Sequence, residues 1–322
     1  MVKMVRTAGI DIGTNSVRLL VAEVTGAAKG PVLRTLHRLM TITRLGEGVD
    51  ERGYLSADAV ERTMMTLRRY RDVMRAEDTE AWEVAATSAA RDAADAMEFM
   101  ERVEDITGTE PRVLTGEEEA DLSFLGATYD LGELRPRDEA VMVVDIGGGS
   151  TEIVVGRDTQ IVEAVSLDLG CVRMSERFLA SDPPQVEELK KMEEYVRLML
   201  APQVDRISRW TPGLMVGLAG TVTTLSGLKQ GLKRYEGEAI HHSWLTLPDV
   251  EALYQRLYSL PLAERRDLMS LEPGRADVIV GGTGVLLVFL RAMGLKEFLV
   301  SEKDMLDGLA IAAARKAGGY VL

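Results

Sequence analysis

The sequence predicts an α/β fold of two related domains with a central cleft, and three observations support this prediction. A turn of small residues follows an aspartate at Asp11–Ser16, and the same pattern returns at Asp145–Ser150. Apolar, β-branched runs flank both copies, which is typical of β-hairpins. In each half of the chain, helices and short strands follow this strand-rich start, which is the order of elements in an α/β protein.

The repeated turn also indicates a chemistry. Glycines and short hydroxyl side chains let backbone N–H groups approach an anion, and successive N–H groups form an anion-binding concavity. The aspartate at the entrance can hold a divalent cation against that anion. One such turn alone could be a tight hairpin without a ligand, but two aligned copies favour phosphate chemistry in the cleft between the domains.

The first half of the chain is expected to contain strands and helices in alternation. Strands are predicted over residues 5–45, with a turn at Gly26–Gly30. Ser56 is a helix cap, because apolar residues recur at helical spacing after it over 57–75. The further elements expected here are a strand at 82–86, a helix at 93–107, a strand at 113–114 and a helix at 115–129.

A linker is expected at Leu131–Glu139, where Pro136 and mixed charges interrupt the pattern. It separates a first domain, 1–130 completed by the C-terminal helix 305–322, from a second domain, 131–304. After the linker, strands are expected at 141–146, 153–155, 162–169, 214–218 and 298–300. Helices are expected from residue 175 onward, from the residue after Pro184 to residue 209, after a turn at 219–224, at 248–258, at 262–269, at 285–293 after a turn at 281–284, and at 305–316.

Composition excludes several classes of protein. The 322 residues carry a net charge of −13, which argues against a nucleic-acid partner, although local basic clusters could still line a cleft. A single cysteine excludes an internal disulfide framework and a cysteine-rich metal site, and the presence of only three histidines argues against a histidine-based zinc site. No transmembrane run and no signal-peptide layout is present, so we expect a cytoplasmic protein without a membrane partner.

Several motifs, in this order and spacing, resemble the exopolyphosphatase/guanosine-pentaphosphate phosphatase (Ppx/GppA) family of the acetate kinase–sugar kinase–Hsp70–actin superfamily. The segments that carry the resemblance are Gly9–Arg18, Ala86–Arg91, Thr115–Ala120, Val144–Glu152, Leu169–Arg173, Leu218–Thr223, Arg275–Asp277 and Gly281–Gly282. The resemblance implies two actin-like (ribonuclease H-like) domains. It also implies Mg²⁺-dependent (or other divalent cation-dependent) hydrolysis of terminal phosphoanhydride bonds, and a homodimer.

The same resemblance implies roles for individual residues. Glu119, directly before Ala120, matches the family's catalytic base, and its like-charged neighbours should raise its proton affinity. Arg91, and more weakly Arg18, would contact the anionic chain. Asp145 and Glu152 match the acids on the metal side, and Asp11 is their counterpart in the other domain. The phosphate cradle would consist of Thr14, Asn15, Ser16, Gly147, Gly148, Gly149 and Ser150.

Each assignment has a structural alternative. Glu119 could only cap its helix, and Arg91 could only form an ion pair at a strand end. Arg18 projects from a hairpin arm, and Glu152 could only orient its turn through a hydrogen bond. The segment Gly281–Gly284, which corresponds to the superfamily's nucleotide-base segment, could simply pack a helix.

Two features depart from the family pattern. Ser301-Glu302-Lys303-Asp304 stands where Ser-Asp-Gly is usual, which puts a close backbone approach there in doubt. The chain ends at Leu322 without the C-terminal helical extension of the long-form enzymes, so we expect a short, two-domain form.

The leading functional hypothesis is an exopolyphosphatase that releases orthophosphate from a chain end. Guanosine-pentaphosphate 5′-phosphatase is the alternative within the same chemistry. A sugar or acetate kinase would need an acceptor site, for which no motif is present. A non-catalytic polyphosphate or nucleotide sensor would predict loss of the acidic positions, which this chain keeps. An actin-like filament protein has no role for the Glu117–Ala120 element.

Overall fold

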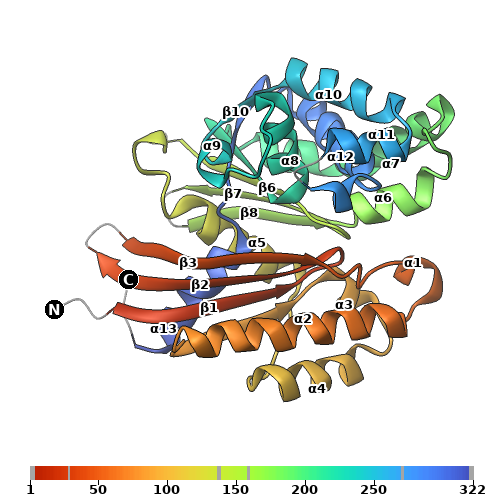
Figure 1. Ribbon diagram of the computed structural model, residues 1–322. Coiled ribbons are helices and arrows are strands. Elements are labelled where there is room, and N and C mark those ends of the chain that lie inside the picture. The colour runs from red at the N-terminus through yellow and green to blue at the C-terminus, as the bar shows by residue number, and fades with distance from the viewer. Residues whose placement is uncertain (1–3, 28–29, 136–138, 158–159, 270–271, 319–322) are drawn as a thin grey trace. The chain divides into compact units, whose positions relative to one another are not determined.

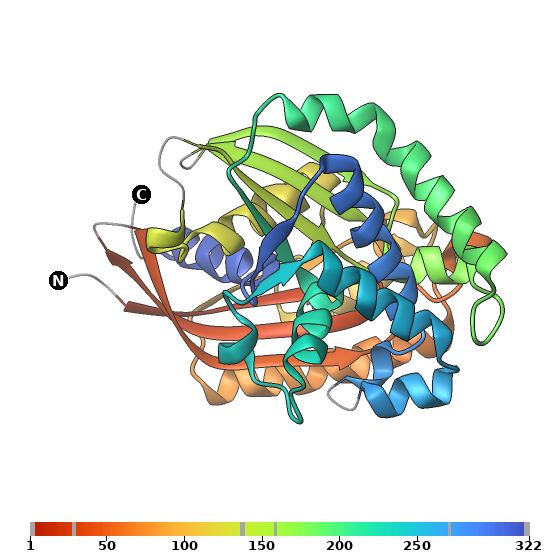
Figure 2. The same cartoon turned by 90° about the horizontal axis from the view of Figure 1, so that it is seen from above.

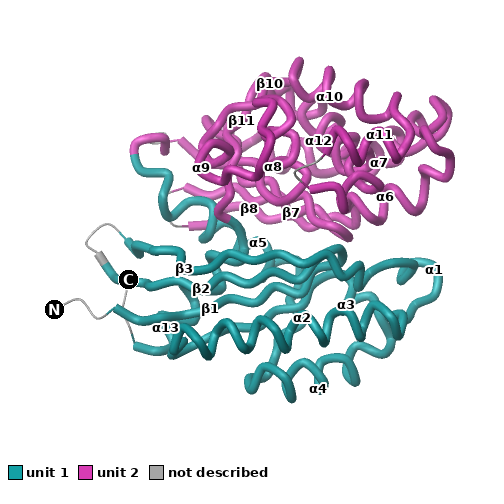
Figure 3. The backbone as a smooth tube through the Cα atoms, viewed as in Figure 1, with its two compact units in different colours: residues 1–132, 304–322 teal, residues 133–303 magenta. Residues whose placement is uncertain are grey.

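The computed structural model describes residues 4–27, 30–135, 139–157, 160–269 and 272–318. These residues form two compact units (Figure 3): unit 1 contains Met1–Gly132 and Asp304–Leu322, and unit 2 contains Glu133–Lys303. The expected domain limits, 1–130 with 305–322 and 131–304, remain a prediction about folding domains. Part of the expected linker, residues 136–138, lies outside the described residues.

Unit 1 contains a five-stranded sheet in the order β3-β2-β1-β4-β5. The strands β1, β2 and β3 form an antiparallel meander, and β4 and β5 extend the sheet in parallel to β1. Their bounds are Met4–Ile12 for β1, Ser16–Ala27 for β2, Gly30–Ile42 for β3, Ala81–Ala86 for β4 and Arg112–Val113 for β5. The strands predicted for this half are therefore confirmed.

Helices cover both faces of this sheet (Figure 1). On one face, α2 (Ala57–Ala76) and α4 (Ala96–Thr107) bury an apolar core against β1, β2 and β4. On the other face, α13 (Met305–Lys316) packs on the sheet, and α5 (Gly116–Thr128) packs on α13. Ser56 caps α2 as predicted, because its hydroxyl accepts a hydrogen bond from the Ala59 amide. The short helices α1 (Val49–Arg52) and α3 (Ser88–Asp92) complete the helices described within unit 1, and the 3-10 helix η1 (Gly132–Leu134) follows α5.

The sheet of unit 2 repeats the topology of unit 1. Its strand order, written from β8, is β8-β7-β6-β9-β11-β10. The first five strands correspond in order to β3-β2-β1-β4-β5 of unit 1, and β10 is an added antiparallel edge strand. The strand directions match as well. The bounds are Val141–Ile146 for β6, Thr151–Arg157 for β7, Gln160–Leu167 for β8, Leu214–Leu218 for β9, Trp244–Thr246 for β10 and Glu297–Val300 for β11. The prediction of two related α/β halves is confirmed.

The helices of unit 2 share one large apolar core with its sheet. Two of them, α7 (green) and α10 (cyan to blue), pack on α12 (blue; Figure 2). The helix bounds are Cys171–Phe178 for α6, Val186–Ser208 for α7, Ala219–Gln230 for α8, Gly237–Ile240 for α9, Leu247–Ser259 for α10, Leu262–Leu268 for α11, Pro273–Arg275 for the 3-10 helix η2 and Ile279–Met293 for α12. In the part of the chain that the structure describes, no helix is long and apolar enough to span a membrane.

Several helix starts differ from the sequence-based expectation. Helix α8 begins at Ala219, so the expected turn 219–224 is itself helical. Helix α6 begins at Cys171 instead of Ser175, and α12 begins at Ile279 instead of Val285. Glycine is required at positions 281 and 282 of α12 because neighbouring helices approach the backbone closely. A Cβ atom at Gly281 would lie 2.8 Å from the Cys171 carbonyl oxygen, and one at Gly282 would lie 2.3 Å from Thr221 Oγ1. The segment 281–284 therefore packs a helix.

Candidate functional site

The two repeated turns have the same hydrogen-bonded geometry. The Gly13 amide donates to the Ser16 carbonyl oxygen at 3.0 Å, and in unit 2 the Gly147 amide donates to the Ser150 carbonyl oxygen at 3.0 Å. Each turn closes the antiparallel hairpin whose first strand carries the aspartate, β1–β2 in unit 1 and β6–β7 in unit 2. The repeat in the sequence is therefore a repeat of structure.

The turn of unit 1 leaves hydrogen-bond donors available to a ligand. The carbonyl oxygen of Thr14 accepts from the Gly46 amide, and that of Asn15 accepts from the amides of Thr43 and Arg44. Within the described residues, the amides of Thr14 and Asn15 donate no hydrogen bond, and the buried Thr14 Oγ1 and Asn15 Nδ2 have no partner. Buried donors without partners are rare in proteins, so this turn fits a bound anion.

The turn of unit 2 has the same polarity. The carbonyl oxygens of residues 147–149 accept hydrogen bonds from Cys171–Arg173, at the start of α6. Among the described residues, the amides of Gly148 and Gly149 donate no hydrogen bond. In each half, two of the predicted cradle residues thus have amides that donate no hydrogen bond among the described residues, and the buried Ser16 and Ser150 belong to the same turns.

The charges beside the two turns differ between the units. Asp11 is opposite Arg18 in the register of its hairpin, whereas Asp145 is opposite Glu152. Directly opposed residues lie on the same face of a sheet, so each pair is close. An ion pair therefore stands in unit 1 at the position where unit 2 has two carboxylates.

In unit 1 the Arg18 guanidinium is bound by carboxylates. Arg18 Nε and Nη2 lie 2.7 and 2.6 Å from Asp11 Oδ2, and Nη1 donates to Asp304. Asp11 is 3% exposed, and burial raises its pKa although Arg18 opposes the rise. Asp11 Oδ1 has no hydrogen-bond partner among the described residues. Arg18 therefore neutralises the charge of Asp11 through Oδ2, and Oδ1 is the carboxylate oxygen that remains for a ligand.

In unit 2, Asp145 and Glu152 are 7% and 3% exposed. Glu152 Oε1 accepts a hydrogen bond from Ser166 Oγ at 2.8 Å, and this bond runs to β8 and not to the turn. Two neighbouring, nearly buried carboxylates form an oxygen donor set of the kind that hard divalent cations prefer. This donor set fits a magnesium ion better than the Asp11–Arg18 pair does.

The first turn of α5 separates the roles of two adjacent glutamates. Glu118 forms a capping box, because its Oε2 accepts from the Thr115 amide at 2.9 Å and its own amide donates to Thr115 Oγ1. It also pairs with Arg112. Glu119 is 6% exposed, and its Oε1 lies 2.5 Å from Arg91 Nη1. The capping box of this helix is therefore formed by Glu118, while Glu119 contacts Arg91.

The surroundings of Glu119 include a like-charged neighbour in the sequence and a cationic contact. Its neighbour Glu118 is turned to Thr115 and Arg112, and the group that contacts Glu119 is the cationic Arg91. Arg91 lies in the last turn of α3 and also donates to the Leu114 carbonyl oxygen at 2.7 Å.

The segment that departs from the family pattern has two structural roles. Asp304 begins α13, because its side chain accepts from the Leu306 amide at 2.9 Å. It also accepts from Arg18, so it is a site residue that sequence reasoning missed. An aspartate three residues before Asp307, ahead of an apolar helix, is the capping signal that could have indicated it. In unit 2, Glu302 accepts from the Tyr235 hydroxyl.

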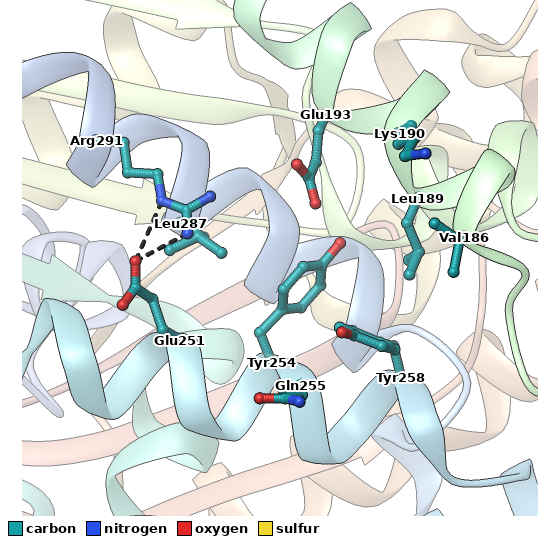
Figure 4. A pocket seen from close by; sticks show the side chains of 10 residues that line it. All are labelled: Val186, Leu189, Lys190, Glu193, Glu251, Tyr254, Gln255, Tyr258, Leu287 and Arg291. Atoms are coloured by element: carbon teal, nitrogen blue, oxygen red, sulfur yellow. Dashed lines mark hydrogen bonds and ion pairs between the residues drawn. The ribbon is translucent and has the colours of Figure 1, made fainter.

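A pocket of about 370 Å³ in unit 2 contains none of the predicted site residues (Figure 4). It lies between α7, α10 and α12, and an ion pair of 2.8 Å joins Glu251 to Arg291 across one side. The Tyr254 hydroxyl points toward Glu193, and burial together with that carboxylate raises the pKa of Tyr254. This pocket is distinct from the turn residues 147–150.

The fold and these residues define an α/β protein with two related halves, each with a glycine-containing hairpin turn next to acidic side chains. The chain belongs to the Ppx/GppA phosphatase family, whose family model matches residues 20–316. The family resemblance and the actin-like fold class predicted from the sequence are therefore confirmed.

Individual relatives match over almost their whole length. Exopolyphosphatase 2 of Mycobacterium tuberculosis is 41% identical over 321 residues, which cover 97% of this chain and 99% of that protein. The crystal structure of the Aquifex aeolicus member of the Ppx/GppA family is 32% identical, with a TM-score of 0.80 over 98% of this chain and 99% of that one. The structure of an exopolyphosphatase from Cytophaga hutchinsonii is 25% identical, with a TM-score of 0.85 over 97% and 98%.

Proposed function

We propose that this protein is an exopolyphosphatase, an enzyme that hydrolyses the terminal phosphoanhydride bond of inorganic polyphosphate and releases orthophosphate. The observation that carries the proposal is the buried Glu119 carboxylate, which Arg91 contacts while Glu118 performs the capping of the helix. The 41% identity to a protein named Exopolyphosphatase 2 supports the same activity.

Glu119 has the chemistry of a general base for this reaction. The carboxylate accepts a proton from a water molecule as the water oxygen attacks the terminal phosphorus atom. The bond from that phosphorus to the bridging oxygen breaks, and the shortened chain leaves with the bridging oxygen. Arg91 fixes the direction of this carboxylate through a contact of 2.5 Å.

The two turns are proposed to bind phosphate oxygens. The donors that the turns would contribute are the backbone amides of residues 14, 15, 148 and 149, which have no acceptor among the described residues. The hydroxyls of Ser16 and Ser150 would add to them. Fixed donors of this kind stabilise negative charge that develops in the transition state. Arg18 contributes indirectly, because it neutralises Asp11 and so removes a negative charge from beside the unit 1 turn.

A divalent cation, Mg²⁺ in the first instance, is proposed to be held by Asp145 and Glu152. When bound there, it would neutralise charge on the phosphate oxygens. Asp11 is a weaker candidate ligand than expected, because Arg18 already binds its Oδ2 atom. The cytoplasmic location and the homodimer remain predictions, which cell fractionation and light scattering of the purified protein would test.

Polyphosphate is the proposed substrate, and guanosine pentaphosphate is the alternative. The relatives named exopolyphosphatase favour the first.

The test is orthophosphate release from tripolyphosphate, long-chain polyphosphate, guanosine pentaphosphate and ATP, each at equal concentrations of chain ends. The reactions are run with Mg²⁺ and again after EDTA. We expect kcat/KM to be highest for polyphosphate and lost with EDTA. A kcat/KM for guanosine pentaphosphate above that for polyphosphate would select the alternative. Binding of all four without release would select the sensor.

A further inference from the structure

The motif Leu169–Arg173 has no role in the proposed chemistry, yet it contacts the unit 2 turn closely. The amide of Cys171 donates to the Gly147 carbonyl oxygen at 2.9 Å, and the amides of Val172 and Arg173 donate to the Gly148 carbonyl oxygen at 2.9 and 3.2 Å. The third carbonyl oxygen, that of Gly149, accepts from the side chain of Arg173, with Nε at 2.8 Å.

Gly170 permits this close approach. A Cβ atom at this position would lie 2.1 Å from the Gly148 carbonyl oxygen and 2.4 Å from the Gly149 carbonyl carbon. Real Cβ atoms do not approach a backbone so closely, so any other residue would displace the turn. The start of α6 therefore acts as a clamp on the turn, and we call Gly170–Arg173 the α6 clamp.

The clamp determines which way the peptide units of the turn face. A peptide unit is planar and trans, so the carbonyl of one residue and the N–H of the next point in opposite directions. Carbonyls held toward α6 thus direct the amides of Gly148, Gly149 and Ser150 away from it. A run of glycines has wide backbone freedom, so its peptides can reorient easily unless they are bound.

Arg173 differs from the rest of the clamp because it acts through a side chain. Backbone amides hold the first two peptides of the turn, and the Arg173 guanidinium holds the Gly149–Ser150 peptide. In unit 1 the equivalent carbonyl oxygen, that of Asn15, is held by the backbone amides of Thr43 and Arg44. A substitution can therefore release this peptide only in unit 2.

We propose that Arg173 is a positioning residue that holds the Gly149–Ser150 peptide so that the Ser150 amide faces the phosphate chain. This inference rests on the proposed function for the identity of the anion. The orientation of the peptide follows from the contacts of Arg173 alone, so it can be tested without turnover.

The test compares Arg173→Met and Arg173→Lys with Arg177→Met. Arg177 lies on the same helix, where its guanidinium covers the Tyr195 ring on the exposed surface. Protein labelled with [¹⁵N]glycine and [¹⁵N]serine gives order parameters for the Gly149 and Ser150 amides. Each variant is also titrated with tripolyphosphate, and kcat and KM for polyphosphate are measured. Unfolding midpoints confirm that each variant is folded.

In the wild type we expect rigid amides, with order parameters of about 0.85, and a shift of the Ser150 resonance on addition of tripolyphosphate. In Arg173→Met the Ser150 order parameter should fall below about 0.6, and KM should rise by roughly 10- to 100-fold, the worth of one charge-assisted hydrogen bond. Arg173→Lys should resemble Arg173→Met, because an ammonium group has no planar Nε–H in that place. Arg177→Met should match the wild type.

Unchanged order parameters in Arg173→Met would overturn the proposal. Full rescue of KM by Arg173→Lys while the Ser150 amide stays as mobile as in Arg173→Met would also overturn it, because substrate binding would then depend on the charge at residue 173 and not on the orientation of the peptide. If the wild type failed to hydrolyse polyphosphate, the proposed function would fall, while the order parameters would still decide whether Arg173 orients the peptide.

Discussion

Three consecutive glutamates in α5 allow the proposed base to be separated from its neighbours by one kind of substitution. Glu117 is exposed, Glu118 completes the capping box, and Glu119 is buried against Arg91. Each is changed to glutamine, which keeps the size of the side chain and removes its charge. The three variants therefore share sequence context and differ in the contacts that they lose.

The expected magnitudes follow from those contacts. Glu117→Gln should leave stability and kcat close to the wild-type values. Glu118→Gln loses an exposed ion pair and a negative charge at a helix N-terminus, so stability should fall by about 0.5–1.5 kcal/mol while kcat stays within about twofold. Glu119→Gln should lower kcat for polyphosphate by about 10²–10⁴-fold, the usual worth of a general base.

The stability of Glu119→Gln should stay within about 1 kcal/mol of the wild type. The ion pair with Arg91 becomes a hydrogen bond from the cationic guanidinium to a neutral amide oxygen, which costs about 1 kcal/mol, but the amide avoids the desolvation of a buried carboxylate. A domain with about 5 kcal/mol or more of stability remains almost entirely folded after such a change. Unfolding therefore cannot account for a 10²-fold loss of kcat.

The assay combines steady-state release of orthophosphate with urea unfolding of all three variants. A kcat for Glu119→Gln above about a tenth of the wild-type value would refute the assignment of the base. Equal losses of kcat in Glu118→Gln and Glu119→Gln would refute the division of roles between the cap and the base.

Three other predictions follow from the site. Arg91→Met should lower kcat by about 10²–10³-fold, measured by phosphate release, and an unchanged kcat would make the Arg91–Glu119 pair purely structural. Glu152→Gln should raise the Mg²⁺ concentration for half-maximal activity by about tenfold or more after EDTA treatment, and an unchanged requirement would place the cation elsewhere. Burial alone would raise the pKa of Asp304, but Arg18 and Arg38 outweigh it and hold that pKa below 3.8. The Asp304 carboxylate therefore contributes stability that is complete above pH 3.8 and is lost as the pH falls through the lower, folded-state pKa. Urea unfolding of Asp304→Asn should show a deficit at pH 7 that shrinks below about pH 4, and a deficit independent of pH would contradict this account.

The sequence predicted those elements whose signals are local. Both hairpins follow from alternating apolar runs around small-residue turns, and α2 follows from its Ser56 cap. The start of α6 was missed because tertiary hydrogen bonds from Cys171 and Val172 to the turn begin this helix ahead of the capping pattern at Ser175. Strand β10 has three residues, too few for a periodic pattern, and it is defined by its pairing with β11.

At the site, residue types were more predictable than partners. The sequence indicated Glu119 and Arg91 separately, whereas their ion pair depends on how α3 and α5 pack. It also placed Asp11 with the metal ligands, because the two turns align, but the opposed residue is Arg18 in one hairpin and Glu152 in the other. Cross-strand partners become visible only when the register of the hairpin is known.

The central claim is that this protein removes single phosphates from the end of a polyphosphate chain. The most direct test is to incubate the protein and Mg²⁺ with long polyphosphate of uniform length and to resolve the products by gel electrophoresis during the reaction. The account predicts orthophosphate as the released product, together with parent chains that shorten from their ends. Chains cut internally into fragments of intermediate size, or no release of orthophosphate at all, would contradict it.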